Sequence, residues 1–161
     1  MNKKTLLVAL LVLATAGGIA ILWRQKPITP LARQQQNYLH KISVGQQILN
    51  VDIAATEAEQ VQGLSDRKSM QDNQGMLFDF GAGSASEPEF WMKDMYFNLD
   101  FVWIKNGAVV DITQNVPAPK NFSDPLPLYA PASPVDSVLE VNAGWAEKNN
   151  IKIGDLVKII S

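Results

Sequence analysis

Two aspartates, Asp100 and Asp111, flank a tight-turn signal and could act as a pair of carboxylates. The signal is Asn106-Gly107, which supplies the two positive φ angles of a type I′ hairpin between alternating apolar residues. Counting outward from this turn pairs Val102 with Asp111. The same register pairs Asp100 with Thr113, so the two carboxylates would be diagonal neighbours on one face of the hairpin.

Paired carboxylates at this spacing suggest hydrolysis of a glycosidic bond. Diagonal neighbours lie about 7 to 8 Å apart at the backbone, and the carboxyl groups of glycoside hydrolases are roughly 5 to 9.5 Å apart. Asp100 and Asp111 are therefore the candidate catalytic residues of a glycosidase-like enzyme. The alternative is a polar strand face or a hydrogen-bond network without catalysis, because many solvated hairpins carry such a pair.

The run over residues 90–104 suggests ligand binding instead, because it mixes aromatic side chains with charges. Trp91 offers a stacking surface and Lys93 a polar contact, and ligand sites commonly combine apolar walls with a few placed polar groups. In the structural alternative Trp91 is a core residue and Lys93 forms an ion pair with Asp100 or Glu140, since an unpaired charge is costly to bury. The candidate ligand contacts are Trp91, Lys93, Asp100, Asp111, Asn115, Tyr129 and Glu140.

Several other chemistries lack the residues they need. The chain has no cysteine, which excludes thiol catalysis, cysteine-ligated zinc, disulfides and a lipidated cysteine. Its single histidine, His40, lies near the start of the domain, so a serine triad is poorly supported. Calcium binding would have to use the same acids without an Asp-x-Asp-x-Asp-Gly loop. We therefore predict neither a metal nor a cofactor.

The first 26 residues predict a membrane segment ahead of the domain. Residues 5–23 contain no charge across nineteen positions and follow the basic lead Asn2-Lys3-Lys4. Nineteen helical residues at about 1.5 Å each approach the roughly 30 Å thickness of a hydrocarbon core. We interpret residues 1–26 as a retained signal anchor that places the domain in the periplasm or on the cell surface. Cleavage after Ala16 would instead release an exported soluble form.

The remainder divides into a linker over residues 27–37 and one domain over residues 38–161. The linker carries two prolines and three consecutive glutamines. Residues 1–26 hold four of the fourteen basic residues and none of the sixteen acidic ones, which leaves ten basic residues and a net charge of −6. Nucleic acid is therefore not expected as a partner, because its phosphates are bound by basic surfaces.

Apolar alternation makes the domain mostly β. A proline-rich stretch over residues 116–134 holds six of the nine prolines, and its aromatic and leucine side chains predict that it packs on the domain. The expected elements are two strands within 39–54, a short helix from the capping box Thr56–Glu59 to Gly63, a strand over 76–80, the hairpin at 106–107, a strand over 135–141, a short helix from Asn142 through Lys148, and a hairpin over 151–160.

A set of short motifs spread over residues 44–160 strengthens this interpretation. The motifs are Gly63-Leu64, Gly75-Met76-Leu77-Phe78, Phe90-Trp91-Met92-Lys93, Leu99-Asp100, Val109-Val110-Asp111, Asn115-Val116-Pro117, Tyr129-Ala130-Pro131, Val138–Gly144 and Ile153-Gly154-Asp155. In order and spacing they resemble the uncharacterised family called domain of unknown function 192. The resemblance implies one small, β-rich, sandwich-like domain, often behind an export or anchor segment, and no established activity. The family tends to have Asn-Thr after Trp-Met-Lys, where this chain has Asp94-Met95.

The sequence thus predicts a mainly β, sandwich-like or barrel-like domain with two short helices behind an N-terminal transmembrane helix. We expect an envelope-anchored module that binds a small molecule such as a saccharide or a peptide. Two alternatives stay open. One is the hydrolase that uses Asp100 and Asp111, and the other is a protein that contacts envelope partners through the proline-rich stretch.

Overall fold

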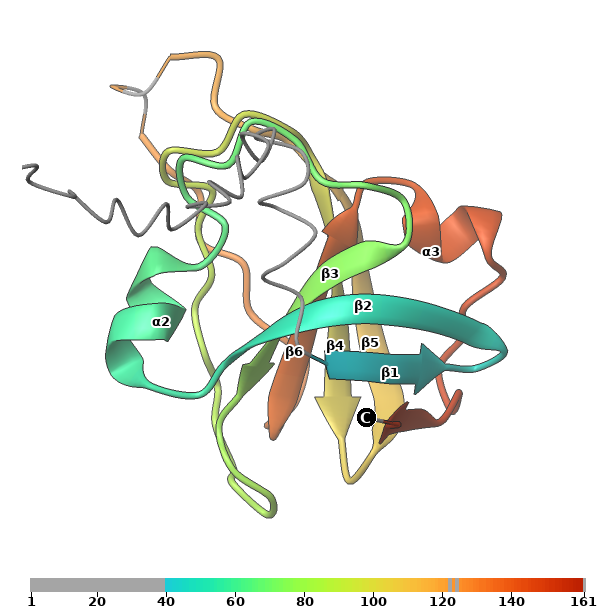
Figure 1. Ribbon diagram of the computed structural model, residues 1–161. Coiled ribbons are helices and arrows are strands. Elements are labelled where there is room, and N and C mark those ends of the chain that lie inside the picture. Colours follow the sequence, from blue (N-terminus) through green and yellow to red (C-terminus); the bar gives the residue numbers. More distant parts are fainter. Residues whose placement is uncertain (1–39, 122, 124, 161) are drawn as a thin grey trace, which may run out of the picture.

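The computed structural model describes residues 40–121, 123 and 125–160 (Figure 1). The predicted transmembrane helix and linker lie outside these residues. Within the described part, no helix has the length and apolar character needed to span a bilayer. The described domain is mainly β, as predicted, with two short helices.

Seven strands form one sheet. The elements are β1 (His40–Val44), β2 (Gln47–Ala54), α2 (Glu57–Gln62), β3 (Gln74–Asp79), β4 (Leu99–Lys105), β5 (Ala108–Val116), β6 (Ser137–Asn142), α3 (Trp145–Lys148) and β7 (Val157–Ile159). Their order across the sheet is β5-β4-β6-β3-β2-β1-β7, and the pairing of β2 with β3 is parallel. The sheet curls so far that β1 and β2 cross in front of β4 and β6 (Figure 1). It is a half-barrel rather than two stacked sheets.

The two outer strands of the half-barrel approach each other beside the β4–β5 turn. Backbone hydrogen bonds join Val109 N–H to the Asp155 carbonyl (2.9 Å) and Gly154 N–H to the Val109 carbonyl (2.8 Å). A third runs from Val157 N–H to the Gly107 carbonyl (2.8 Å). The predicted hairpin over 151–160 is wrong. β7 pairs instead with β1, the first described strand of the chain.

Alternate residues of the central strands serve two cores. One core fills the curl of the sheet and takes Leu77, Val102 and Leu139, together with the buried Trp145 of α3. The other lies on the opposite face of β3, β4 and β6, which we call the outer face, and includes Phe78, Phe101 and Val138. Loop residues cover this outer face, among them Met92, Met95 and Tyr129. Strands buried on both sides explain why continuous apolar runs, rather than strict alternation, mark β3 and β4.

The predicted hairpin turn is confirmed, but the predicted register is not. Asn106 and Gly107 both have positive φ, and Lys105 pairs with Ala108. Beyond the turn the pairing shifts twice, so Asp111 lies opposite Trp103 instead of Val102. Because strand residues alternate between faces, one extra residue in β5 is enough to move Asp111 to the other side of the hairpin.

The predicted helix limits are confirmed for α2 but not for α3. The capping box of α2 is present, with Glu59 N–H donating to Thr56 Oγ1 and Thr56 N–H donating to the Glu59 carboxylate. Asn142 does not begin α3, because it is still part of β6, and the chain turns into the helix at Gly144, whose φ is 80°. Glycine adopts such a positive φ without strain, which explains Gly144 at the start of the helix.

Gly75 of β3 should tolerate no side chain, because β6 passes too close. A Cβ atom there would lie 2.8 Å from the Glu140 carbonyl oxygen and 3.1 Å from Leu139 Cδ1. We expect Gly75→Ala to lower the free energy of unfolding by about 1 to 3 kcal/mol, as overpacking does, in a urea titration. Gly81→Ala is the control, since open space surrounds Gly81 and only its φ of 94° opposes a side chain. Because the φ of Gly81 alone opposes alanine, the deciding result is that of Gly75→Ala itself, and an unchanged or higher free energy of unfolding for this variant would contradict the steric explanation.

Candidate functional site

Asp100 is a structural residue in this fold. Its side chain is fully buried in the curl of the sheet, with 0% of its surface exposed. The carboxylate accepts hydrogen bonds from Asn115 N–H (2.9 Å), Gly144 N–H (3.1 Å) and Ala146 N–H (3.0 Å). It therefore ties β4 to the bulge of β5 and to the start of α3, and Asn115 contributes its backbone rather than its side chain to this contact.

The predicted carboxylate pair is not formed. Asp111 lies on the outer face of the sheet, where its carboxylate accepts Ile112 N–H (2.8 Å) and Ala132 N–H (3.3 Å). Asp100 faces the curl on the other side of the same hairpin. The cause is the register shift in β5, which counting from the turn could not reveal. The geometry does not support joint catalysis by these two residues.

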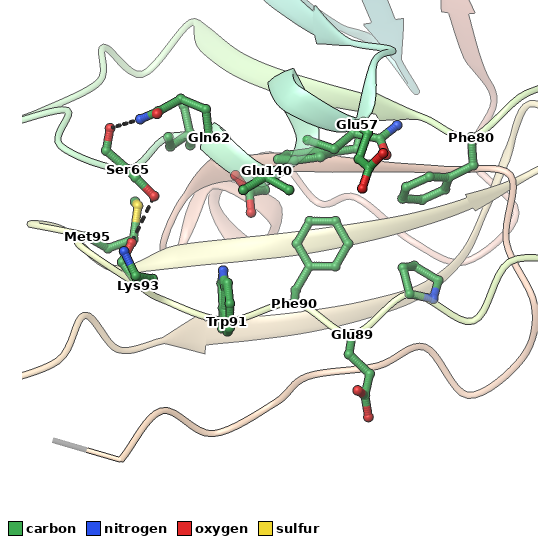
Figure 2. Close-up of a pocket in the computed structure, with 16 residues that line it drawn as sticks. Glu57, Gln62, Ser65, Phe80, Glu89, Phe90, Trp91, Lys93, Met95 and Glu140 are labelled. Carbon is green, nitrogen blue, oxygen red and sulfur yellow. Dashed lines mark hydrogen bonds between the residues drawn. The ribbon is translucent and has the colours of Figure 1, made fainter.

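A pocket lies on the outer face of β3 and β6, between α2 and residues 88–95 (Figure 2). Its volume is about 240 Å³. Four rings form much of its wall, those of Phe78, Phe80, Phe90 and Trp91. Figure 2 shows Glu140 at the centre, with α2 on one side and Phe90 and Trp91 on the other. We call this cavity the Glu140 pocket.

The helical side of the Glu140 pocket is held by hydrogen bonds at both ends of α2. The capping box fixes its start, and the hydrogen bonds that the Glu59 carboxylate accepts from the backbone and side chain of Thr56 and from Ala55 N–H lower the pKa of Glu59. The Gln60 amide donates to the Ala54 carbonyl (3.3 Å) and to the Asp79 carbonyl (3.0 Å). The helix is thereby fastened to the ends of β2 and β3.

The opposite side of the pocket is fixed by contacts with two distant segments. Phe90 and Tyr129 exchange backbone hydrogen bonds of 2.8 Å in both directions. Ser65 Oγ donates to the Lys93 carbonyl (3.0 Å), as Figure 2 shows. The Phe90 ring also meets the Phe78 ring edge to face, with 4.9 Å between centroids. The aromatic wall is therefore preorganised, and residues 88–95 are not a free loop.

Glu140 is the unusual group of the pocket. It sits on central strand β6 between its cross-strand partners Met76 and Phe101, with only 4% of its surface exposed. Burial raises the pKa of its carboxyl to about 8, although the positive charge of Arg67 acts in the opposite direction. At neutral pH the group is therefore mostly protonated and uncharged.

The other buried polar side chains of the described part have hydrogen-bond partners. Besides Asp100, Gln74 accepts Gln71 N–H (2.9 Å) and Asp136 accepts Asn106 N–H (2.8 Å). No hydrogen bond to the Glu140 carboxyl is found among the described residues. No fully buried side-chain nitrogen or oxygen of that part lacks a partner, so the carboxyl oxygens of Glu140 border the open space of the pocket. Because its side chain lines the pocket, the carboxyl is free to bond to a molecule that enters.

The remaining charges of the pocket lie near its rim. Lys93 is exposed and pairs with its neighbour Asp94 at 2.5 Å, and the hydrogen bond and charge of Asp94 raise the pKa of Lys93. The ion pair with Asp100 or Glu140, weighed as the structural alternative, is not formed. Trp91 is 49% exposed, so it is not a core residue either. Exposed Glu57 and Glu89 add two carboxylates to the lining.

The structure brings together three of the predicted contacts, Trp91, Lys93 and Glu140. Asp100, Asp111 and Asn115 lie elsewhere, and Tyr129 supports the aromatic wall from behind, with its ring 5.8 Å from that of Phe101. Sequence reasoning missed the α2 side of the pocket. The one local signal was Val61, an apolar residue on a short helix, which is 67% exposed and lines the pocket. In the described part, no group of three or more histidine or acidic side chains is arranged to hold a metal ion.

Comparisons with known proteins give a family but no activity. The sequence model of the family DUF192, described as an uncharacterized ACR, matches residues 40–159. No functionally curated protein matches the chain. A crystal structure of a proposed transcription regulator from Sinorhizobium meliloti 1021 is similar, with 29% identity, a TM-score of 0.64, and coverage of 74% of this chain and 92% of that one.

A second crystal structure has the same fold. It is a protein of unknown function from Novosphingobium aromaticivorans DSM 12444, with 28% identity and a TM-score of 0.63. The match covers 73% of this chain and 83% of that one. Both similarities extend over most of the domain described above, so the half-barrel is shared with solved structures.

Proposed function

The chain belongs to the DUF192 family, whose members are uncharacterised, and we propose that its domain is a binding module that holds a small organic ligand in the Glu140 pocket. A saccharide or a peptide is the expected kind of ligand. The single observation that carries this proposal is the buried Glu140 carboxyl, which lacks a hydrogen bond among the described residues and lies where a ligand would enter.

The energetics of Glu140 favour a binding role over a purely structural one. A carboxyl moved from water to the wall of an apolar pocket without a hydrogen bond from the protein destabilises the fold, so its presence at this position calls for an explanation. An apolar residue at this position of β6 would match the Val138 that precedes it on the outer face. A ligand that bonds to the carboxyl supplies the missing partner, and perturbed carboxyls in clefts are typical of functional sites.

Binding is better supported than hydrolysis by paired carboxylates. Glu140 is the one buried carboxyl of the pocket, since Glu57 and Glu89 are exposed. Nucleic acid is not proposed as the ligand, although one solved relative is described as a proposed transcription regulator. The net charge of −6 beyond residue 26 would repel phosphates. A partner protein that contacts the proline-rich stretch stays a prediction.

Ligand-induced thermal stabilisation tests the proposal. The full-length chain would be heated in a non-ionic detergent with millimolar N-acetylglucosamine, glucosamine, trialanine or trilysine. A ligand at 100 times its Kd stabilises the folded state by about 2.7 kcal/mol, so we expect at least one of these compounds to raise Tm by several degrees. Glu140→Gln should remove the shift in Tm, whereas Glu147→Gln, at an exposed position of α3, should keep it. Identical shifts in both variants would place binding outside the pocket.

We also propose that residues 5–23 anchor the domain to a membrane, with the domain in the periplasm or on the cell surface. The support is the nineteen-residue uncharged segment after two lysines. Full-length protein should remain in the membrane pellet after alkaline carbonate washing, and Leu11→Arg should shift it to the supernatant because a charge at the helix centre is costly. A soluble mature form that begins after Ala16 would contradict retention of the segment.

A further inference from the structure

The Glu140 pocket combines an acidic lining with an aromatic wall. Building on the binding function proposed above, we propose that the group it holds is an organic ammonium ion, carried by an amino sugar or by a peptide amine. The carboxylate of Glu140 would face the ammonium group at the bottom of the pocket. The rings of Phe90 and Trp91 would surround its carbon substituents.

The charge balance of the lining favours a cation. Three carboxyl side chains line the pocket, those of Glu57, Glu89 and Glu140, against the single ammonium group of Lys93. Lys93 is already paired with Asp94, which is not part of the lining. An anionic ligand would therefore meet the negative charges of Glu57 and Glu89, whereas a cation would be attracted by them and would favour the ionised form of Glu140.

The rings of the wall suit the same kind of ligand. Aromatic faces attract ammonium groups, most strongly when water is excluded, and aromatic cages are a common means of binding alkylated amines. Directly after residues 88–95 the structure shows such a contact outside the pocket, where Lys68 Nζ lies 3.2 Å from the centre of the Tyr96 ring. A volume of about 240 Å³ is below the roughly 300 to 1,000 Å³ of drug-sized sites, so the pocket admits a small head group rather than a whole polymer.

Binding of an ammonium ion should be coupled to loss of a proton. The free carboxyl of Glu140 is mostly protonated at pH 7, because burial raises its pKa to about 8. A nearby positive charge favours the ionised carboxylate, so the proton passes to the buffer as the ligand binds. The other charged groups that face Glu140 or line its pocket are Arg67, Glu57, Glu89 and Lys93. A neutral ligand would instead accept a hydrogen bond from the protonated carboxyl and release no proton.

Titration calorimetry with two matched pairs of probes tests this inference on the full-length protein in non-ionic detergent. One pair is glucosamine and N-acetylglucosamine, and the other is Nα-acetyl-lysine amide and its Nε-acetylated form. Within each pair, acetylation removes the positive charge and leaves most of the molecule unchanged. Measurement at pH 7 in phosphate and in MOPS gives the number of protons released, because these buffers differ in ionisation enthalpy and neither carries a primary ammonium group that could compete for the pocket.

We expect one amine to bind at least tenfold tighter than its acetylated twin and to release close to one proton. The pair that shows this difference identifies the source as an amino sugar or a peptide amine. Glu140→Gln should abolish both the preference and the proton release, and Trp91→Leu, at a half-exposed position, should weaken binding without changing the proton count. Glu147→Gln, at an exposed position of α3 outside the pocket, should keep both.

Two results would overturn the inference, and they have different consequences for the proposed binding function. Equal or tighter binding of the acetylated twins, still dependent on Glu140, would show that the pocket holds a neutral ligand, so the binding function would survive without the ammonium group. Binding of none of the four probes would overturn the ammonium assignment. If the thermal shifts were absent as well, the proposed binding function would fail with it.

Discussion

Raising the pH from 5 to 9 should remove several kcal/mol of stability from the wild-type domain, and Glu140→Gln should prevent most of that loss. Burial raises the pKa of Glu140 from an ordinary value of 4.5 to about 8 in the folded state. Between pH 4.5 and about pH 8, the folded protein therefore keeps a proton on Glu140 that the unfolded chain has already lost. Stability must fall as pH rises across this window, because the unfolded state binds fewer protons there.

The size of the effect follows from the two pKa values. A shift of one unit corresponds to about 1.4 kcal/mol, so a rise from 4.5 to about 8 amounts to roughly 4 to 5 kcal/mol once the group is fully ionised. The contribution is fully present below pH 4.5 and is lost as pH passes through 8. Glutamine has nearly the same shape and no charge, so the variant lacks this loss and should exceed the wild type in stability at pH 9.

Urea denaturation at pH 5, 7 and 9, followed by tryptophan fluorescence, measures the difference. Glu147→Gln on the exposed face of α3 is the matched control and should follow the wild type at each pH. If the wild type and Glu140→Gln lost stability in parallel between pH 5 and 9, the carboxyl of Glu140 would not be the group that titrates. Burial would then not raise the pKa of Glu140 in the folded state as the structure indicates.

Asp100→Ala should unfold the domain or bring it close to unfolding at room temperature. The substitution leaves three backbone donors without an acceptor, the N–H groups of Asn115, Gly144 and Ala146. Each buried N–H that loses its partner costs about 1 to 3 kcal/mol. The combined loss is comparable to the total stability of about 5 to 15 kcal/mol that is usual for a domain.

Two further variants separate this cause from a general effect of removing an acid. Asp100→Asn should lose less than Asp100→Ala, because one amide oxygen can still accept from Asn115 and Gly144 while the amide nitrogen faces Ala146 N–H. Asp111→Ala should change stability by about 1 kcal/mol at most, since its two contacts lie in partly exposed positions. Thermal unfolding of the three proteins provides the comparison. Similar losses for Asp100→Ala and Asp111→Ala would contradict the structural role of Asp100.

The hairpin shows how far local sequence reasoning reaches. Asn106-Gly107 selects its own turn through positive φ angles, so the tip of the hairpin could be predicted from two residues. The register of β5 depends on bulges, and these arise where distant groups need a partner. The second register shift lies where Asn115 N–H meets the buried carboxylate of Asp100. The spacing of residues within the hairpin therefore does not reveal the position of the register shift.

The candidate site was predictable on one side and not on the other. Trp91 and Lys93 stood out because the run over residues 90–104 mixes aromatic side chains with charges, and Glu140 stood out as a charge on a predicted strand. The structure places all three around one cavity. The partner of Lys93 is its neighbour Asp94, at a positive φ of 55° that alternation does not indicate. The α2 side of the pocket comes from tertiary packing, in which Gln60 reaches the Asp79 carbonyl nineteen residues away.

The pairing of β7 with β1 has a consequence for how the chain acquires its fold during synthesis. β1 is the first described strand to leave the ribosome, and its neighbour at the sheet edge, β7 (Val157–Ile159), is the last described strand. Pairing of β1 with β7 closes the longest loop between described strands. This pairing is expected to form late, because closing a long loop costs the most chain entropy. A nascent chain therefore keeps this edge of β1 unpaired until β7 has been synthesised, which leaves the edge open to chaperones.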